Sequence, residues 1–318
     1  MLREVEGFVP AYLALHRSGE LHRRVEEAYA RLGSCDCCPR SCGADRREGG
    51  EGAGCRTGER AKLASYHAHF GEESPLVGSR GSGTIFFAGC NLSCVYCQNY
   101  DISQLDRGQE VGPEALAAVM LRLQNAGCHN VNLVSPSHVV PQILAALLIA
   151  VEAGLRVPLV YNTGGYDALT TLALLDGVVD IYMPDMKYSD ADVGRRFSGV
   201  EDYPAANTAA VKEMHRQVGD LQLDRQGTAT RGLLVRHLVL PNGLAGSAES
   251  LVFLAREVSE QTYLNIMAQY RPCYKAGGLP ELNRCITEEE YRRVVEVARD
   301  VGLRRLDQRI TGWLLPSV

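Results

Sequence analysis

The feature that most constrains the fold is an alternation of short apolar runs with helical patterns, which begins near residue 63. Such alternation is typical of repeated βα units around a parallel sheet. The expected strands lie at residues 84–87, 130–134, 159–162, 180–183, 233–240 and 263–267, with a weaker one at 303–306. The expected helices lie at residues 113–125, 140–153, 168–175, 206–218, 248–260 and 288–301. Six or seven repeats favour a barrel, open or closed, with a doubly wound open sheet as the alternative.

The first 62 residues follow a different pattern. Apolar residues recur there at helical spacing, at Leu21, Val25, Ala28 and Leu32. This spacing predicts an amphipathic helix laid on a larger body. Residues 34–58 are polar and glycine-rich and have no apolar period, so they need a constraint such as a metal to be ordered. We therefore expect a small N-terminal helical and Cys-rich metal-binding module at residues 1–62 and a barrel at residues 63–318.

The charge and the apolar runs exclude several classes of partner. A formal net charge of −5 leaves no global basic field to hold nucleic acid or an anionic membrane. Glu4 and Glu6 interrupt the start of the chain, so no signal peptide is expected there. The longest apolar run, residues 143–151, is far shorter than the roughly 20 residues that span a bilayer. We therefore expect a cytoplasmic protein with no nucleic-acid or membrane partner.

Eleven cysteines in a cytoplasmic chain indicate metal or redox chemistry, because the cytosol keeps thiols reduced. Cys90, Cys94 and Cys97 follow the first expected strand at x3 and x2 spacing. Three thiolates can hold three irons of a 4Fe-4S cube and leave the fourth iron open, whereas a closed electron-transfer cluster takes four cysteines. A catalytic zinc with three ligands and a buried trio of thiols are the alternatives.

A second group of thiols lies in the N-terminal module, at Cys35, Cys38, Cys42 and Cys55. Four thiols are enough to close a tetrahedral zinc site or to hold a second iron-sulfur cluster. The softness of thiolate ligands does not separate these two metals, so zinc and iron-sulfur both stay open. In either case we expect this module to bind its own metal.

The spacing of Cys90, Cys94 and Cys97, with the aromatic Tyr96 before the last cysteine, resembles the motif of the radical S-adenosylmethionine (radical SAM) superfamily. Other segments resemble a branch called PflX-like, which is related to the activating enzymes of glycyl-radical enzymes such as pyruvate formate-lyase. These segments are residues 81–90, 97–100, 161–166, 184–188, 236–241 and 269–272. The resemblance extends from about residue 34 to the carboxyl end. Its relatives share the four N-terminal cysteine positions, and Cys37 lies outside that pattern.

This resemblance implies a fold, cofactors and a reaction. The fold would be a partial (β/α)6 barrel of the TIM type, with a 4Fe-4S cluster and S-adenosylmethionine as cofactors. The reaction would be reductive cleavage of S-adenosylmethionine to a 5'-deoxyadenosyl radical for hydrogen abstraction. Glycyl-radical activation of a protein partner is one use of that radical, and modification of a small molecule or peptide is the alternative. The partners would be an electron donor such as flavodoxin or ferredoxin, and a protein substrate. The alternative of another class is an iron-sulfur electron carrier or a zinc-dependent interaction protein.

The resemblance also implies roles for residues at the strand ends. Asp185 and Lys187 match an Asp-x-Lys pattern whose residues orient S-adenosylmethionine or the substrate, so we expect both to be catalytic. Only four of the 33 basic residues are lysine, which favours a specific need for a compact ammonium at this position. His237 matches a ribose- or carboxylate-contacting position, although a satisfied core histidine is the alternative. Asn162 and Thr163, which end a strand, are expected to contact the cofactor, as is Tyr96.

One segment departs from the superfamily pattern. Many members carry Gly-Gly-Glu after the second strand as a contact for the methionine amino group, whereas this chain has Ser135-Pro-Ser-His138. Ser135, Ser137 or His138 is expected to replace that contact, and the sequence does not rank them. A polar cluster earlier in the chain faces either the barrel mouth or solvent; it comprises His67, His69, Glu72 and Glu73.

Overall fold

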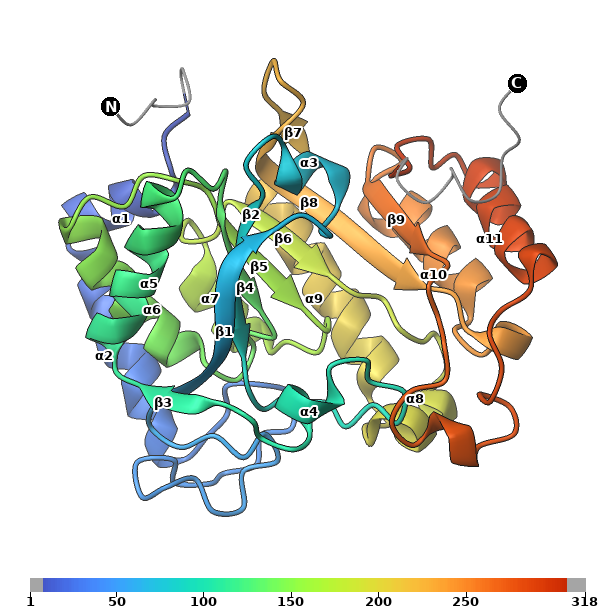
Figure 1. Ribbon diagram of the computed structural model, residues 1–318, viewed down its shortest axis with the longest axis horizontal. Coiled ribbons are helices and arrows are strands. Elements are labelled where there is room, and N and C mark those ends of the chain that lie inside the picture. Colours follow the sequence, from blue (N-terminus) through green and yellow to red (C-terminus); the bar gives the residue numbers. More distant parts are fainter. Residues whose placement is uncertain (1–7, 308–318) are drawn as a thin grey trace.

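The computed structural model describes residues 8–307, and within this range the strands form one nine-stranded sheet (Figure 1). The strands are β1 (Ala61–His69), β2 (Ser82–Phe87), β3 (Gln109–Val111), β4 (Val131–Val134), β5 (Leu159–Thr163), β6 (Ile181–Pro184), β7 (Gln222–Leu223), β8 (Ala229–Leu238) and β9 (Tyr263–Met267). Their order is β3-β1-β2-β4-β5-β6-β8-β7, with β9 also paired to β8. The strands β2, β4, β5, β6, β8 and β9 pair in parallel, and β1, β3 and β7 pair antiparallel. The predicted α/β fold with a mostly parallel sheet is confirmed.

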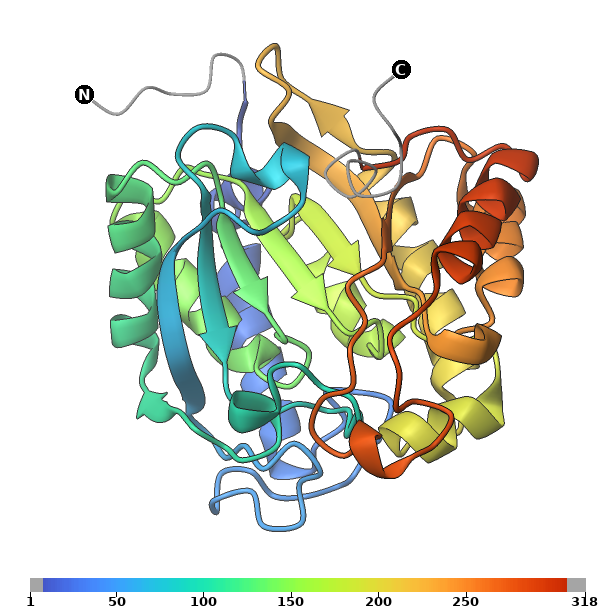
Figure 2. The same cartoon turned by 45° about the vertical axis from the view of Figure 1, so that its right-hand side comes forward.

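Helices follow the parallel strands and cover the outer face of the sheet (Figure 2). They are α5 (Pro113–Asn125), α6 (Val140–Glu152), α7 (Leu169–Leu175), α8 (Ala191–Ser198), α9 (Tyr203–Val218), α10 (Ser247–Phe253) and α11 (Glu288–Asp300). Alternate strand residues such as Leu133, Tyr161 and Val235 pack with these helices in the main hydrophobic core. On the opposite face, a small apolar cluster surrounds Val160 and Met183. Helices on one face are typical of a barrel and not of a doubly wound sheet.

The barrel is partial. Within residues 8–307, neither β1 nor β3 pairs with β9 or β7, so the sheet does not close on itself. Six parallel strands, each followed by helix, make up the predicted (β/α)6 arrangement. The carboxyl ends of these parallel strands lie at the same edge of the sheet. The loops that follow the strands therefore come together at this edge.

The N-terminal helices pack on the outside of the barrel. They are α1 (Tyr12–Arg17) and α2 (Glu20–Ala30), and α2 packs against α6. The buried carboxylate of Asp180 accepts hydrogen bonds from the backbone N–H of Ala11 and of Leu159, which ties the N-terminal segment to the sheet. Residues 34–60 contain no helix or strand, and the division at residue 63 stays a prediction because β1 already begins at Ala61.

Several elements differ from the expected pattern. The sequence did not indicate β1, β3, β7 or the helices α3 (Ser74–Val77), α4 (Tyr100–Ser103) and α8. The weak strand expected at 303–306 is reduced to one bridge between Leu306 and Leu264. The helix expected at 248–260 ends as α10 followed by a π-helical segment, Leu254–Val258. Among residues 8–307, no helix is long and apolar enough to span a membrane.

Candidate functional site

The loop that follows β2 carries three thiols at the carboxyl edge of the sheet; we call residues 90–97 the cluster loop. Neighbouring segments hold its backbone, since Ser93 N–H donates to Ser198 O at 3.0 Å and Val95 N–H donates to Phe197 O at 2.8 Å. The Asn91 side chain donates to the carbonyl of Tyr166 at 2.6 Å. The loop is therefore fixed by the ends of α8 and by the segment after β5.

The three thiols of the cluster loop have polar neighbours. Cys94 Sγ lies 3.0 Å from the Ser198 hydroxyl, Cys97 Sγ lies 3.1 Å from the Ser103 hydroxyl, and Cys90 Sγ accepts from Leu92 N–H at 3.4 Å. Burial raises the pKa of Cys90 to about 12. Burial also raises the pKa of Cys94, although the ammonium of Lys187 counteracts it. Cys90 and Cys94 would stay protonated as free thiols, so a cationic metal centre is needed to hold these two as thiolates.

The donor set fits an iron-sulfur cube. Each cysteine thiolate of a 4Fe-4S cube binds a different iron. Hydrogen bonds to the sulfurs tune the reduction potential of the cluster. Within residues 8–307, no three His, Cys, Asp or Glu side chains are grouped so that they could hold a single metal ion. That result does not count against a cube, because its three thiolates bind three different irons. The site therefore suits a 4Fe-4S cluster on Cys90, Cys94 and Cys97.

An ion network lies beside the cluster loop, on the inner face of the sheet. Asp185 accepts from Lys187 Nζ at 2.7 Å and from Arg236 Nε at 2.7 Å. Arg236 also donates to the Asn162 side-chain oxygen at 2.8 Å. Burial would raise the pKa of Asp185, but the charges of Arg236 and Lys187 outweigh it and hold that pKa below its usual value. The structure thus brings together three predicted residues, Asp185, Lys187 and Asn162.

The hydroxyls at the ends of β4 and β5 already have protein partners. Ser137 Oγ lies 2.9 Å from Thr163 Oγ1, and Thr163 donates to the buried carboxylate of Asp167 at 2.6 Å. His138 Nε2 lies 3.0 Å from the carbonyl of Ala88, and burial lowers its pKa to about 4. Binding S-adenosylmethionine through Ser137, Thr163 or this ring nitrogen would require one of these contacts to change.

The Ser135 backbone adopts φ +59°, in the left-handed region that non-glycine residues rarely occupy. Its N–H donates to the Asn162 carbonyl at 2.9 Å, which continues the β4–β5 pairing. The turn that leaves β4 therefore has the backbone shape that glycine adopts most easily. A cofactor contact by Ser135 stays a prediction.

His237 and Tyr96 are enclosed by protein. His237 Nδ1 lies 2.8 Å from Met186 O, and Nε2 lies 2.8 Å from the Ser247 hydroxyl. Burial lowers the pKa of His237 to about 4, so the ring is neutral. Tyr96 accepts from the Tyr188 hydroxyl at 2.6 Å within a buried aromatic group. Their predicted roles in binding the cofactor stay predictions, and a contact through either ring nitrogen of His237 would need an existing hydrogen bond to change.

The N-terminal cysteines surround a buried arginine. Arg46 is fully buried, donates to the carbonyls of Thr57 and Gly58, and lies 3.8 Å from Cys35 Sγ. None of these partners is a carboxylate. A hydrogen bond from the Cys37 thiol, together with Arg46, lowers the pKa of Cys35 to about 5. Cys38 and Cys55 are buried and Cys42 is exposed, and these thiols are not grouped as a closed metal site.

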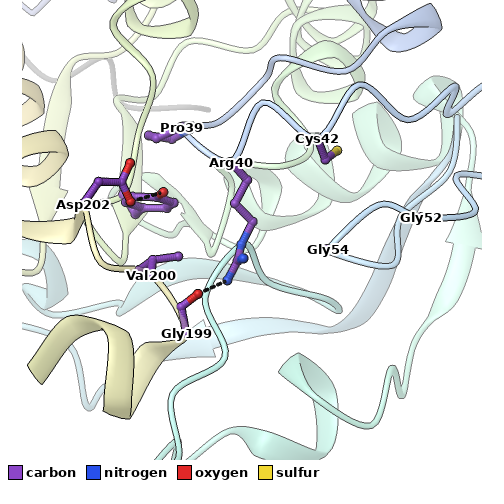
Figure 3. Close-up of a pocket in the computed structure, with 9 residues that line it drawn as sticks. Pro39, Arg40, Cys42, Gly52, Gly54, Gly199, Val200 and Asp202 are labelled. Atoms are coloured by element: carbon purple, nitrogen blue, oxygen red, sulfur yellow. Dashed lines mark hydrogen bonds between the residues drawn. The ribbon is translucent and has the colours of Figure 1, made fainter. Parts of the chain in front are cut away.

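The N-terminal module contacts the cluster loop directly. Arg40 Nε donates to the Asn91 carbonyl at 2.6 Å, and its Nη2 reaches the Gly199 carbonyl at 3.4 Å (Figure 3). Gly89 has φ +80°, and a Cβ on it would lie 2.6 Å from the Cys55 carbonyl, so only glycine fits between the module and the loop. A pocket of about 460 Å³ opens along this junction, lined on the barrel side by Gly199, Val200 and Asp202 (Figure 3).

Sequence reasoning gave no site role to Arg236, although it lies next to His237, which was predicted. Adjacent residues of a strand point to opposite faces. Arg236 faces the ion network, and His237 faces the helices. The signal that could have found Arg236 is a charged residue in the centre of an otherwise apolar strand, because such a charge needs a partner.

Comparisons with known proteins agree with this geometry. A family model described as "Radical SAM superfamily" matches residues 84–224. The uncharacterized protein MJ0674 of Methanocaldococcus jannaschii is 31% identical over 290 residues, which cover 89% of this chain and 79% of that protein.

Two groups of solved structures are similar at a lower level. A radical SAM methyltransferase from Sphaerobacter thermophilus matches with a TM-score of 0.47 and 16% identity, over 69% of this chain and 64% of that one. Streptococcus suis SuiB bound to the precursor peptide SuiA matches with a TM-score of 0.45 and 13% identity, over 66% of this chain and 43% of that one. The chain therefore spans less than two thirds of the length of both solved structures.

Proposed function

Because the chain belongs to the radical SAM superfamily, we propose that it is an enzyme that reductively cleaves S-adenosylmethionine and uses the product radical to abstract hydrogen from a substrate. Membership implies a 4Fe-4S cluster and S-adenosylmethionine. When bound, these groups supply the 5'-deoxyadenosyl radical. The observation that carries the proposal is the position of Cys90, Cys94 and Cys97 beside the Asp185–Lys187 pair, where Lys187 is close enough to act on the pKa of Cys94.

The residues of this chain would bind and orient. Cys90, Cys94 and Cys97 would hold the cluster, and Lys187 would place a positive charge next to the thiolates and the cofactor carboxylate. Asp185 holds Lys187 through the 2.7 Å ion pair, so the ammonium already has a fixed orientation before the cofactor binds. The side chains of Asp185 and Lys187 are mostly buried, which limits the water around the reacting atoms.

The test is anaerobic reconstitution of the full chain with iron and sulfide, followed by S-adenosylmethionine and a strong reductant. The wild type should form 5'-deoxyadenosine, and the Cys90/Cys94/Cys97→Ala variant should form none and lose the iron of this site. Cys285→Ala, which removes an exposed thiol, is the matched control and should behave as the wild type. No 5'-deoxyadenosine from fully loaded wild type would contradict the proposal.

The finer reaction follows from the resemblance alone. Glycyl-radical activation of a protein partner stays a prediction, as does the PflX-like branch, because the family model describes the superfamily. An electron donor such as flavodoxin or ferredoxin would replace the chemical reductant in the cell. Formation of an electron-paramagnetic-resonance signal of a glycyl radical in a co-purified protein would support this use of the radical.

We also propose that the N-terminal module binds its own metal through Cys35, Cys38, Cys42 and Cys55. Arg46 supports the proposal, because a buried cation with neutral oxygen partners is stabilised by nearby thiolate charge. Metal analysis of the full chain with the three cluster-loop cysteines already replaced isolates this site. Cys37→Ala should keep its metal, and Cys38→Ala should lose it. Equal metal content in both variants would contradict the assignment.

A further inference from the structure

A group of polar side chains lies on the inner face of the sheet, next to the ion network. We call it the acceptor cluster; its members are Glu72, Glu73, Asn132 and Asn265. Asn132 lies between Val131 and Leu133, which both pack outward into the main core, so its own side chain is on the inner face. Asn265 lies on β9 and Glu73 in the segment after β1. The cluster thus joins three distant parts of the chain.

The members of the cluster touch one another. Asn265 Nδ2 donates to Glu73 Oε1 at 2.9 Å, and Arg236 Nε lies 3.9 Å from the same oxygen. Glu72 lies close enough to Glu73, Arg236 and Asn132 for each of them to affect its pKa. Glu73 and Asn265 are 6% exposed and Asn132 is fully buried. These groups have therefore been taken out of bulk water.

Three oxygen atoms of the cluster lack a donor. Among residues 8–307, Glu73 Oε2, Asn265 Oδ1 and both polar side-chain atoms of Asn132, Oδ1 and Nδ2, have no hydrogen-bond partner. Buried acceptors are nearly always paired, because leaving one unpaired is costly. Three of these four atoms are acceptors, so the missing partner must supply several donors. A primary ammonium carries three N–H donors.

The carboxylates around the acceptor cluster outnumber the cations, which favours binding of a cation. Three carboxylates lie here, Glu72, Glu73 and Asp185, against two cations, Lys187 and Arg236. Burial first, and the charge of Glu73 second, raise the pKa of Glu72 to about 7, so a bound cation would favour the ionised form of this carboxyl. Burial and His67 lower the pKa of the nearby His69, so that ring adds no positive charge at neutral pH. His67 itself is exposed.

The cluster is connected to the chemistry. Arg236 joins Glu73 to Asp185, Asp185 holds Lys187, and Lys187 acts on the thiol of Cys94. A group bound at Glu73 would therefore be linked to the cluster loop through this chain of contacts. We propose that the acceptor cluster binds an alkylammonium group of the substrate, an assignment that rests on the proposed function. The source of that group is either a lysine side chain of a peptide or a free aliphatic amine.

The test measures binding to the full chain loaded with cluster and S-adenosylmethionine, by anaerobic titration calorimetry. The probes are 1-aminopentane, pentan-1-ol and Nα-acetyl-lysine methylamide. The first two have the same carbon chain, but the first ends in an ammonium and the second in a neutral hydroxyl. The amine should bind at least about tenfold more tightly than the alcohol, as expected for hydrogen bonds to a charged group. Tighter binding of the lysine derivative than of 1-aminopentane would assign a peptide source, and the reverse order a free amine.

Variants locate the binding site. Glu73→Gln keeps the shape and removes the charge, so it should weaken binding of the amine by roughly tenfold to a hundredfold and leave pentan-1-ol unaffected. Glu72→Gln should also weaken binding of the amine. This second variant keeps the test valid if Glu73→Gln fails to fold. Glu249→Gln removes an exposed carboxylate on α10 and is the matched control. Melting temperatures of all variants check that each is folded.

The possible results separate the two proposals. Equal binding of amine and alcohol, no binding of either, or unchanged amine binding in both Glu73→Gln and Glu72→Gln would overturn the alkylammonium assignment. Formation of 5'-deoxyadenosine by the same wild-type sample is measured in parallel. Normal formation with any of those binding results refutes this inference alone, whereas its absence refutes the proposed function whichever probe binds.

Discussion

The two faces of the sheet carry polar side chains that are used in different ways. On the outer face, the strand residues Thr163 and His237 are buried and paired; Thr163 donates to Asp167, and both ring nitrogens of His237 have partners. On the inner face, charged groups gather around Asp185, and several buried oxygens have no donor. These two outward-facing strand residues therefore have a structural environment that is already complete, whereas the inner face resembles a ligand-binding site.

The largest effect that tests this contrast between the two faces is expected at Arg236, which faces inward and is next to His237 in the sequence. Arg236→Met should lower the free energy of unfolding by on the order of 3 kcal/mol, because it leaves Asp185 and Glu73 with fewer compensating charges. Urea denaturation at pH 8 measures this loss. Arg293→Met on the exposed face of α11 is the control and should have little effect. A change within about 0.5 kcal/mol for Arg236→Met would mean that the ion network contributes little to stability.

Changes at Asp185 and Lys187 should slow catalysis, and they should also lower stability because they break the same buried ion network. Lys187→Ala and Asp185→Asn should slow formation of 5'-deoxyadenosine on the order of 100-fold at equal cluster loading, because a displacement of about 1 Å costs that much. Lys187→Arg should rescue only partly, since it keeps the charge but changes reach and hydration. Wild-type rates and cofactor affinity in all three variants would remove both residues from the active site.

On the outer face, Thr163→Val should cost stability. The Thr163 hydroxyl bonds to Asp167, Ser137 and the Gly165 N–H, so its removal should lower the free energy of unfolding by about 1–3 kcal/mol. Thr170→Val, at an exposed position of α7, is the control. If Thr163→Val instead weakens S-adenosylmethionine binding and leaves stability unchanged, the predicted cofactor contact is right and the contrast between the faces fails there.

A further effect is expected in the pH dependence of stability. Burial lowers the pKa of His237 from 6.5 to about 4, so between these values the unfolded chain takes up a proton that the folded chain does not. The stabilisation is present above pH 6.5 and is lost as the pH falls toward 4. His237→Asn should reduce this slope by up to about 1.4 kcal/mol per pH unit. Urea denaturation at pH 7, 6 and 5 measures it, with the exposed His22→Asn as control. Parallel slopes in wild type and His237→Asn would refute this account.

The sequence predicted the parallel strands well because they are continuous apolar runs, as buried strands are. β5, β6 and β9 lie within a residue or two of their expected positions. β1 was not predicted, because its sequence mixes histidine, lysine and serine with apolar residues and its pairing with β2 is antiparallel. β3 and β7 are too short to show a period.

The sequence predicts the cluster loop because a single short motif contains all three of its cysteines. Three cysteines within eight residues form the cluster loop in the sequence and in the structure. Which face a residue occupies was harder to predict, because a strand that is buried on both faces lacks alternation. Arg236 faces the ion network and His237 faces the helices, and the cofactor contact expected of His237 stays a prediction. The acceptor cluster joins Glu73 and Asn265 over 192 positions, a contact that only the folded sheet creates.

The left-handed backbone at Ser135 limits what evolution can place at that corner of the active edge. Glycine fits without strain, and asparagine or aspartate at little expense, but branched or bulky side chains are strongly disfavoured at φ +59°. A mutational scan of this position should therefore give a short tolerated set of small and polar residues. New specificity in descendants of this chain would have to arise from its neighbours, because this corner cannot supply a large side chain.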